Sequence, residues 1–319
     1  MSVFFGRRKA TAWFFGASLL LGLLPGSNPL FADDGPGWLP GLLEREAITV
    51  VITDSGLGGL SVVADAAEKL KRHRGFRKVD LVFVNALFSD QGGYNGLASR
   101  EEKTAVIDSA LHAMSERYDP DLVLVACNTL SVIVDDTPFA RSGVTPWVGI
   151  VETGSQQIAG FLEGRPNAMN LMFATRTTVE EGEHLEQLLA AGIAESQFLA
   201  QACPQLTQYI EQGYDAMDTE LLIDAYVDEA LSSIGAVNGP LSVSFNCTHF
   251  GYSLDAWKRA FDDRGIEVAA WLDPNRRMVD FLLPQESERR FDESEVTVKV
   301  VSMVDIPAAS LESIGRWLR

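Results

Sequence analysis

A repeating pattern of strand, turn and helix, which starts near residue 47, constrains the fold more than any other feature of the chain. Ala47 to Thr53 (AITVVIT) is a run of β-branched and apolar residues, which suits a buried strand of a parallel sheet. Helical stretches separate it from similar runs, which predict strands over 79–85, 121–126, 147–151, 170–174 and 241–245. Strands that alternate with helices favour parallel sheets covered by helices. We therefore expect an α/β fold.

The pattern runs in two series, which predicts two similar doubly wound parallel-sheet lobes with the active site between them. The first lobe is expected over residues 47–145 and the second over residues 146–267. The tail, about 268–319, could complete the first lobe or return to the second. The 319 residues are enough for two such lobes with full-sized cores.

The first 32 residues have the order of a secretory signal peptide. A basic start (Arg7 to Lys9) precedes an uncharged, largely apolar run from Ala10 to Leu24, and small residues around Ala32 offer a cleavage point. The run falls short of the roughly 20 residues that span a bilayer. We therefore expect residues 1–32 to be removed and the protein to be exported, to the periplasm, by the Sec or the twin-arginine route. The alternatives are an uncleaved anchor or a buried helix.

Composition excludes several classes of partner. The formal net charge is −18 at pH 7, and such an acidic chain repels phosphate backbones, so we expect no nucleic-acid partner. After cleavage of the signal peptide we also expect no membrane association. The three cysteines and four histidines contain no metal-binding spacing such as Cys-x-x-Cys, so no metal site is predicted.

Two tripeptides that follow expected strands carry the strongest chemical signal. They are Cys127 to Thr129 and Cys247 to His249. Ligands of open α/β sheets bind beyond the carboxyl ends of the strands, and a helix start, which we expect after each cysteine, lowers a thiol's pKa. Two thiols on opposite sides of one carbon can remove a proton from one face and deliver one to the other. The alternative is that both are small buried hydrophobic residues.

A glycine-rich stretch, Asp54 to Gly59 (DSGLGG), follows the first strand. Glycines let the backbone approach a ligand closely, but the spacing fits neither a dinucleotide fingerprint nor a phosphate loop. Asp54 could bind an ammonium group or polarise a neighbouring thiol, and the alternative is a turn or capping aspartate. Cys203 lies away from any expected strand end, so we interpret it as structural.

Together these residues resemble the glutamate racemases of the aspartate/glutamate racemase superfamily, over about residues 47–275. The family's Asp-Ser-Gly-x-Gly-Gly-Leu element matches Asp54 to Leu60, its Ala-Cys-Asn-Thr element matches Ala126 to Thr129, and its Cys-Thr-His element matches Cys247 to His249. Weaker matches lie at 148–152, 174–178 and 202–204. Each element alone is weak, but the ordered set is specific.

The resemblance implies an amino-acid racemase that needs no cofactor and in which two cysteines exchange protons with the α carbon. It implies Cys127 and Cys247 as the two bases, with Asp54 and His249 as their catalytic neighbours. The residues implied to bind the substrate are Ser55, Tyr94, Asn128, Thr129, Thr175, Thr178 and Thr248. A small amino-acid substrate, a homodimer, and the supply of D-glutamate for cell-wall peptidoglycan precursors in the cytoplasm are usual in the family.

Several departures from the family leave alternatives open. Asn85 replaces an aspartate after the second strand, a longer loop at 92–96 replaces Pro-Tyr-Gly, and Phe250-Gly251 replaces Tyr-Pro. Three functions remain open. The chain is a racemase that acts on glutamate, aspartate or a relative, or it is another enzyme of the superfamily, such as an isomerase or decarboxylase. The third function is that of an exported amino-acid-binding protein without turnover. Single-cysteine decarboxylases lack one of the two thiols, so the presence of both cysteines in this chain argues against a decarboxylase of that kind.

Overall fold

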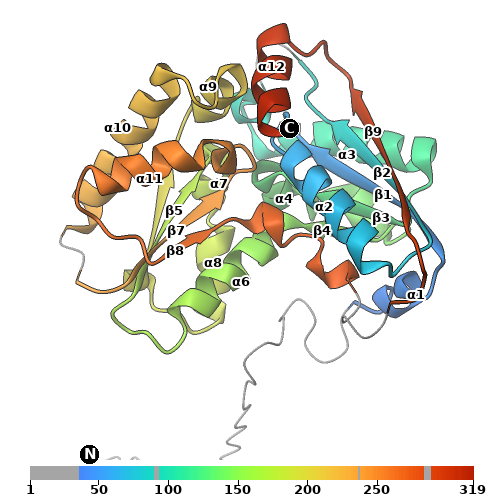
Figure 1. Ribbon diagram of the computed structural model, residues 1–319, viewed down its shortest axis with the longest axis horizontal. Helices are drawn as coiled ribbons and strands as arrows, with labels where there is room; N and C mark the ends of the chain where they lie inside the picture. The colour runs from blue at the N-terminus through green and yellow to red at the C-terminus, as the bar shows by residue number, and fades with distance from the viewer. Residues whose placement is uncertain (1–35, 90–92, 236–237, 284–288) are drawn as a thin grey trace, which may run out of the picture.

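The computed structural model describes residues 36–89, 93–235, 238–283 and 289–319 and shows two lobes side by side, each built on its own parallel sheet (Figure 1). The expected α/β fold with two parallel-sheet lobes is confirmed. The first sheet has the order β4-β3-β1-β2-β9 and the second has the order β6-β5-β7-β8. The strands are β1 (Ala47–Asp54), β2 (Lys78–Asn85), β3 (Leu122–Val125), β4 (Trp147–Gly149), β5 (Met169–Ala174), β6 (Phe198–Ala202), β7 (Leu241–Asn246), β8 (Ala270–Leu272) and β9 (Glu295–Ser302). The expected signal peptide, residues 1–32, lies outside the described residues.

Helices cover both faces of each sheet, because the buried strands present apolar side chains to both sides. The helices are α1 (Leu39–Leu43), α2 (Leu60–His73), α3 (Arg100–Tyr118), α4 (Asn128–Val134), α5 (Pro138–Ser142), α6 (Ile150–Leu162), α7 (Arg176–Glu181), α8 (Glu183–Ala190), α9 (Leu206–Gln212), α10 (Met217–Ile234), α11 (Leu254–Asp262) and α12 (Ala308–Trp317). In the first lobe α2 packs on one face and α3 with α4 on the other. In the second, α9, α10 and α11 cover one face and α6 with α8 the other. None of the helices in the described ranges is long and apolar enough to cross a membrane.

The boundary between the lobes differs from the expected one at residue 146. Trp147–Gly149 forms β4, which pairs with β3 in the first sheet, whereas α6 begins at Ile150 and packs in the second lobe. The tail is divided in a similar way: β8 joins the second sheet, β9 pairs with β2 in the first, and α12 packs on α9. Strand pairing, which decides this membership, is a tertiary property that local hydrophobic pattern does not contain.

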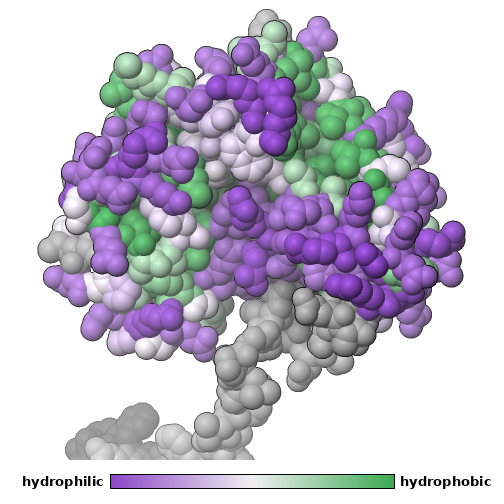
Figure 2. All heavy atoms as spheres, in the orientation of Figure 1, coloured by the Kyte–Doolittle hydropathy of each residue, from purple (hydrophilic) through white to green (hydrophobic). Residues whose placement is uncertain are grey.

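Other differences have local causes. The helical region after β5 is divided into α7 and α8, because Gly182 adopts a left-handed φ of 71° between them. No strand was expected from the sequence at β6, β8 or β9, and all three are edge strands with partly exposed side chains. Figure 2 shows a hydrophilic band across the middle of this face, where the lobes meet.

Candidate active site

The two sheets bring the strand-end residues to the interface between the lobes. The chain reverses its direction of winding between β1 and β3 in the first sheet, and between β5 and β7 in the second. Such switch points leave a crevice beyond the carboxyl ends of the two strands. Asp54 ends β1 and Cys127 follows β3, while Thr175 follows β5 and Cys247 follows β7. The fold therefore places the candidate residues of both series at the two crevices.

Cys127 is buried beside the loop that follows β1. Its Sγ lies 3.1 Å from the hydroxyl oxygen of Ser55. Burial, and then the negative charge of Asp54, raise the pKa of the Cys127 thiol far above its usual value, although hydrogen bonds from Ser55 and the Leu130 backbone favour the thiolate. The prediction that a helix start would lower this pKa is therefore wrong for Cys127. The α4 helix has only seven residues, and its N-terminus does not offset the burial.

Cys247 lies beside an imidazole. Its Sγ is 3.9 Å from His249 Nδ1, and His249 Nε2 is 2.7 Å from Glu211 Oε1. Burial alone would lower the pKa of His249, but the hydrogen bonds to Cys247 and Glu211 raise it well above its usual value. No α-helix starts at Cys247, contrary to expectation: a 3-10 turn, η4 (Phe250–Ser253), follows, and α11 begins at Leu254.

Glu211 is a site residue that the sequence analysis missed. It lies on α9, and its Oε1 accepts both the His249 hydrogen bond and the backbone N–H of Leu57 from the first lobe, at 2.8 Å. Burial opposes its ionisation, but the hydrogen bond and charge of His249 lower the pKa of Glu211 below its usual value. The sequence holds only a weak indication of Glu211. Leu206 and Ile210 form the buried face of α9, and Glu211 follows Ile210 at the edge of that face.

A hydrogen bond between the lobes joins the Cys247 element to the end of β1, next to the loop that contacts Cys127. The Thr248 hydroxyl donates to Asp54 Oδ2 at 2.7 Å. The glycine-rich loop allows this approach: a Cβ on Gly58 would lie 2.2 Å from Thr248 Oγ1, and a Cβ on Gly56 would lie 2.8 Å from Glu211 Oε1. The glycines therefore let the second lobe approach this loop closely.

Three threonines continue the contact between the lobes. Thr129 Oγ1 lies 2.7 Å from Thr175 Oγ1, which lies 3.0 Å from Thr178 Oγ1. Beside them, both side-chain polar atoms of Asn128 and the Oδ1 atom of Asp54 are buried without a hydrogen-bond partner among the described residues. Because unpaired buried polar atoms are costly, these atoms mark where a polar ligand would bind.

Tyr94 and Asn85 lie where the sequence departs from the family, and both side chains bond to other residues of this chain. The Tyr94 hydroxyl donates to the Ala86 carbonyl at 3.2 Å, and its ring packs in the core of the first lobe. The Asn85 side chain donates to the Ser302 hydroxyl at 3.2 Å and accepts the Leu87 N–H. Asn85 therefore ties the end of β2 to the end of β9. The expected loop at 92–96 is described only from residue 93 onward.

The position of Cys203 differs from the one expected from the sequence. It follows β6 directly, so it does lie at a strand end. The strand was missed because FLAQA is short and contains no β-branched residue. The Cys203 thiol is 1% exposed within the apolar core of the second lobe, as a structural cysteine would be.

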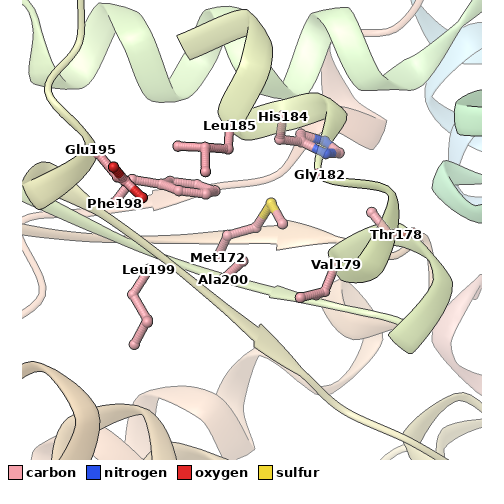
Figure 3. A pocket seen from close by; sticks show the side chains of 10 residues that line it. All are labelled: Met172, Thr178, Val179, Gly182, His184, Leu185, Glu195, Phe198, Leu199 and Ala200. Atoms are coloured by element: carbon pink, nitrogen blue, oxygen red, sulfur yellow. The ribbon is translucent and has the colours of Figure 1, made fainter. Parts of the chain in front are cut away.

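A separate pocket of about 210 Å³ lies in the second lobe, between β5, β6, α7 and α8 (Figure 3). Its walls are mostly apolar, with Met172, Leu185 and Phe198 among them. His184 borders it, and burial lowers the pKa of this histidine to about 3, so the ring is neutral. The described part of the chain contains no group of three or more His, Cys, Asp or Glu residues that could hold a metal ion.

Taken together, the site contains two thiols with opposite surroundings. Cys127 faces a carboxyl group, and burial with that charge raises the pKa of its thiol, while Cys247 lies beside the His249 imidazole, whose own pKa is raised by its hydrogen bonds. Two thiols at one interface, in such different surroundings, can act as an acid and base pair. Such a pair can exchange protons with an acidic C–H bond held between the lobes.

Comparisons with known proteins find glutamate racemases among the relatives of this chain. The chain is 28% identical to the glutamate racemase of Herpetosiphon aurantiacus over 243 residues, 74% of this chain and 87% of the relative. It is 26% identical to that of Pectobacterium carotovorum over 261 residues, 78% of this chain and 83% of the relative. No family model matches the chain.

Solved structures share the fold. The glutamate racemase of Campylobacter jejuni superposes with a TM-score of 0.63 at 20% identity, over 85% of this chain and 98% of its own. That of Escherichia coli, solved with L-glutamate and an activator, gives 0.59 at 20% identity, over 85% of this chain and 95% of its own. The sequence relatives and the fold together support a glutamate racemase-like family, and an amino-acid racemase, for this chain.

Proposed function

We propose that this chain racemises glutamate, aspartate or a related amino acid, without a cofactor, by proton exchange between the α carbon and two cysteines. The observation that carries the proposal is the Asp54–Thr248 hydrogen bond of 2.7 Å, because it joins the Cys247 element to the loop after β1, whose Ser55 contacts Cys127 Sγ at 3.1 Å. One substrate carbon held in that interface would have a thiol on each face.

The surroundings of the thiols assign their resting roles. Cys247, beside the His249 imidazolium, is the base, and Cys127, whose thiol pKa is raised by burial and Asp54, is the acid. Cys247 takes the α proton of one enantiomer, and Cys127 delivers its own proton to the opposite face. The protons have then changed places, and the site is ready for the other enantiomer.

Neutral donors would hold the substrate. The Asn128 amide, unpaired in the described structure, and the Thr129 hydroxyl suit a carboxylate, and the Thr248 hydroxyl would join them on turning from Asp54 to the substrate. Asp54 Oδ1, also unpaired, and Ser55 suit the ammonium group. Thr175 and Thr178 stand next in the same hydrogen-bonded chain and would contact the substrate side chain. The glutamate racemases that share the fold favour an acidic amino acid.

Isotope exchange in deuterium oxide tests the proposal. The purified protein is incubated with a single enantiomer of glutamate or aspartate under reducing conditions, and the configuration and α-deuterium content are followed. We expect inversion with deuterium incorporation, abolished by Cys127→Ala and by Cys247→Ala. Cys203→Ala is the matched control, because it removes a buried thiol from the core of the second lobe and should leave turnover within about threefold. Binding of glutamate without exchange would instead indicate a binding protein.

We also propose that the protein is exported to the periplasm after removal of residues 1–32, as the basic and apolar pattern of that segment predicts. The enzyme would then act on extracytoplasmic D-amino acids rather than on the cytoplasmic supply of peptidoglycan precursors. Its described cysteines are all free thiols, which the chemistry requires. N-terminal sequencing of the protein recovered from periplasmic extract tests this, and an intact Met1 in the cytoplasmic fraction would contradict it. The homodimer usual for the family stays a prediction.

A further inference from the structure

Asn275 lies where the chain crosses from the second lobe back to the first. It sits in the short turn η5 (Pro274–Arg276), which follows β8 of the second sheet. The segment just beyond, including Met278 and Leu282, packs in the core of the first lobe against α2 (Figure 1). Asn275 is only 3% exposed, so its side chain is enclosed at the junction of the lobes.

Its side-chain amide donates two hydrogen bonds, one to each lobe. Nδ2 lies 2.9 Å from the Ser61 hydroxyl oxygen and 2.9 Å from the Thr248 carbonyl oxygen. Ser61 belongs to the first turn of α2 and donates to the Gly58 carbonyl of the glycine-rich loop at 2.9 Å. The Thr248 carbonyl belongs to the peptide between Thr248 and His249, next to Cys247. One side chain thus fixes the Cys247 element relative to the loop that carries Asp54 and Ser55.

The turn that carries Asn275 is itself anchored. The Asn275 N–H donates to Asp273 Oδ1 at 3.1 Å, and Gln157 of α6 donates to the Asp273 carbonyl at 3.4 Å. Asp273 also packs against the residues that follow Cys247, since a Cβ on Gly251 would lie 2.8 Å from its Oδ2. Asn275 therefore has little freedom to follow the Cys247 element if that element moves.

We propose that Asn275 is a positioning residue that holds Cys247 against the first lobe and so sets how efficiently the Cys247 thiol delivers a proton. The inference rests on the two-cysteine racemisation proposed above. Proton transfer needs close alignment of donor and carbon, and a displacement of about 1 Å can slow such a step by about 100-fold. The amide nitrogen of Asn275 bonds Ser61 and the Thr248 carbonyl rather than a thiol, so Asn275 acts on Cys247 through the Thr248 peptide.

The two directions of reaction respond differently to a displaced Cys247. When Cys127 takes the α proton, the C–H electron pair stays on carbon and an S–H bond forms. Delivery by Cys247 then breaks its own S–H bond and inverts the carbon. If Cys247 is displaced, Cys127 exchanges its S–H proton with solvent and returns a solvent hydrogen to the original face. For the opposite enantiomer, abstraction by Cys247 is slow, but delivery by Cys127 is unimpaired.

The test measures deuterium in recovered substrate and in product, starting from each pure enantiomer of glutamate in deuterium oxide. For Asn275→Ala and Asn275→Asp we expect kcat to fall by about 10- to 100-fold. We also expect the ratio of deuterated starting enantiomer to product to rise for one enantiomer and not for the other. Asn170→Ala is the matched control: it removes a buried amide near the start of β5, hydrogen-bonded to Ser242, and should leave the ratio unchanged.

The outcomes separate this inference from the function on which it rests. No α-deuterium exchange by the unmodified protein would overturn the racemase proposal. Normal exchange by the unmodified protein, with an unchanged ratio in both Asn275 variants or an equal change for both enantiomers, would overturn the positioning role alone. If neither Asn275 variant folds, Ser61→Ala decides. It removes the first-lobe partner of the amide, and we expect a smaller one-sided rise, whereas an unchanged ratio would refute the inference.

Discussion

Replacing Glu211 with glutamine probes the part of the site that the sequence did not predict. The substitution keeps the size of the side chain and an oxygen that can accept the Leu57 N–H, but it removes the negative charge 2.7 Å from His249 Nε2. His249 is then left with less support for its imidazolium form beside Cys247. We therefore expect Glu211→Gln to impair turnover more than folding.

The magnitude follows from the charge that the Glu211–His249 hydrogen bond loses. A hydrogen bond to a charged group contributes about 1.5–3 kcal/mol, and each 1.36 kcal/mol corresponds to tenfold in rate. If the His249 imidazolium loses support of that size, kcat/KM should fall by about 10- to 150-fold. The thermal unfolding of the variant should stay cooperative, because the side chain is isosteric.

The pH dependence gives a sharper check than the rate alone. Glu211 raises the pKa of His249, so its removal lowers that pKa. The alkaline limb of the kcat/KM profile, where His249 loses its proton, should then move to lower pH. Glu220→Gln makes the same chemical change at a partly exposed glutamate paired with Arg259 and should leave the profile unchanged. An alkaline limb that stays in place in Glu211→Gln would refute the role given to the carboxylate.

Three further predictions concern other contacts. Gly58→Ala places a Cβ 2.2 Å from Thr248 Oγ1, so it should cost about 1–3 kcal/mol in the free energy of unfolding and abolish turnover; full activity would contradict the close approach of the lobes. Thr175→Val removes a hydroxyl that bonds Thr129 and caps α7 through the Thr178 N–H, so we expect a higher KM together with a loss of about 1–2 kcal/mol of stability, measured by initial rates and calorimetry. Because Glu211 has a lowered pKa, its contribution to stability is present above its ordinary value of 4.5 and is lost as the pH falls; denaturant unfolding of Glu211→Gln and the unmodified protein should therefore converge in acid and diverge near pH 6.

The sequence predicted the strands that are buried on both faces, because runs such as Ala47 to Thr53 have one dominant signal. It did not predict that Trp147–Gly149 pairs with β3, since nothing in three residues records which sheet they join. It also missed β9, a partly exposed edge strand that pairs with β2 from more than 200 residues away. Local pattern thus identified every interior strand and the edge strand β4, but it missed the edge strands β6, β8 and β9.

The residues of the candidate site also fall into those that the sequence located and those that it did not. Cys127, Cys247 and Asp54 follow strands directly, so the rule that ligands bind at carboxyl ends located them. Glu211 and Asn275 lie on a helix and a turn, and only the packing of the lobes brings them to the cysteine elements. The pKa of Cys127 could not be predicted from a helix start, because burial and the Asp54 charge are three-dimensional effects that outweigh it.

The charges of the site bear on how an acidic amino acid could enter so acidic a protein. The chain carries a formal charge of −18, and the ionisable groups next to the two thiols are Asp54, Glu211 and His249. Burial raises the pKa of Asp54 above its usual value, and the charge of His249 opposes that rise. A substrate ammonium group beside Asp54 would favour its carboxylate, while neutral amide and hydroxyl donors hold the substrate carboxylate. Substrate affinity should therefore fall in acid, as the Asp54 carboxyl becomes protonated.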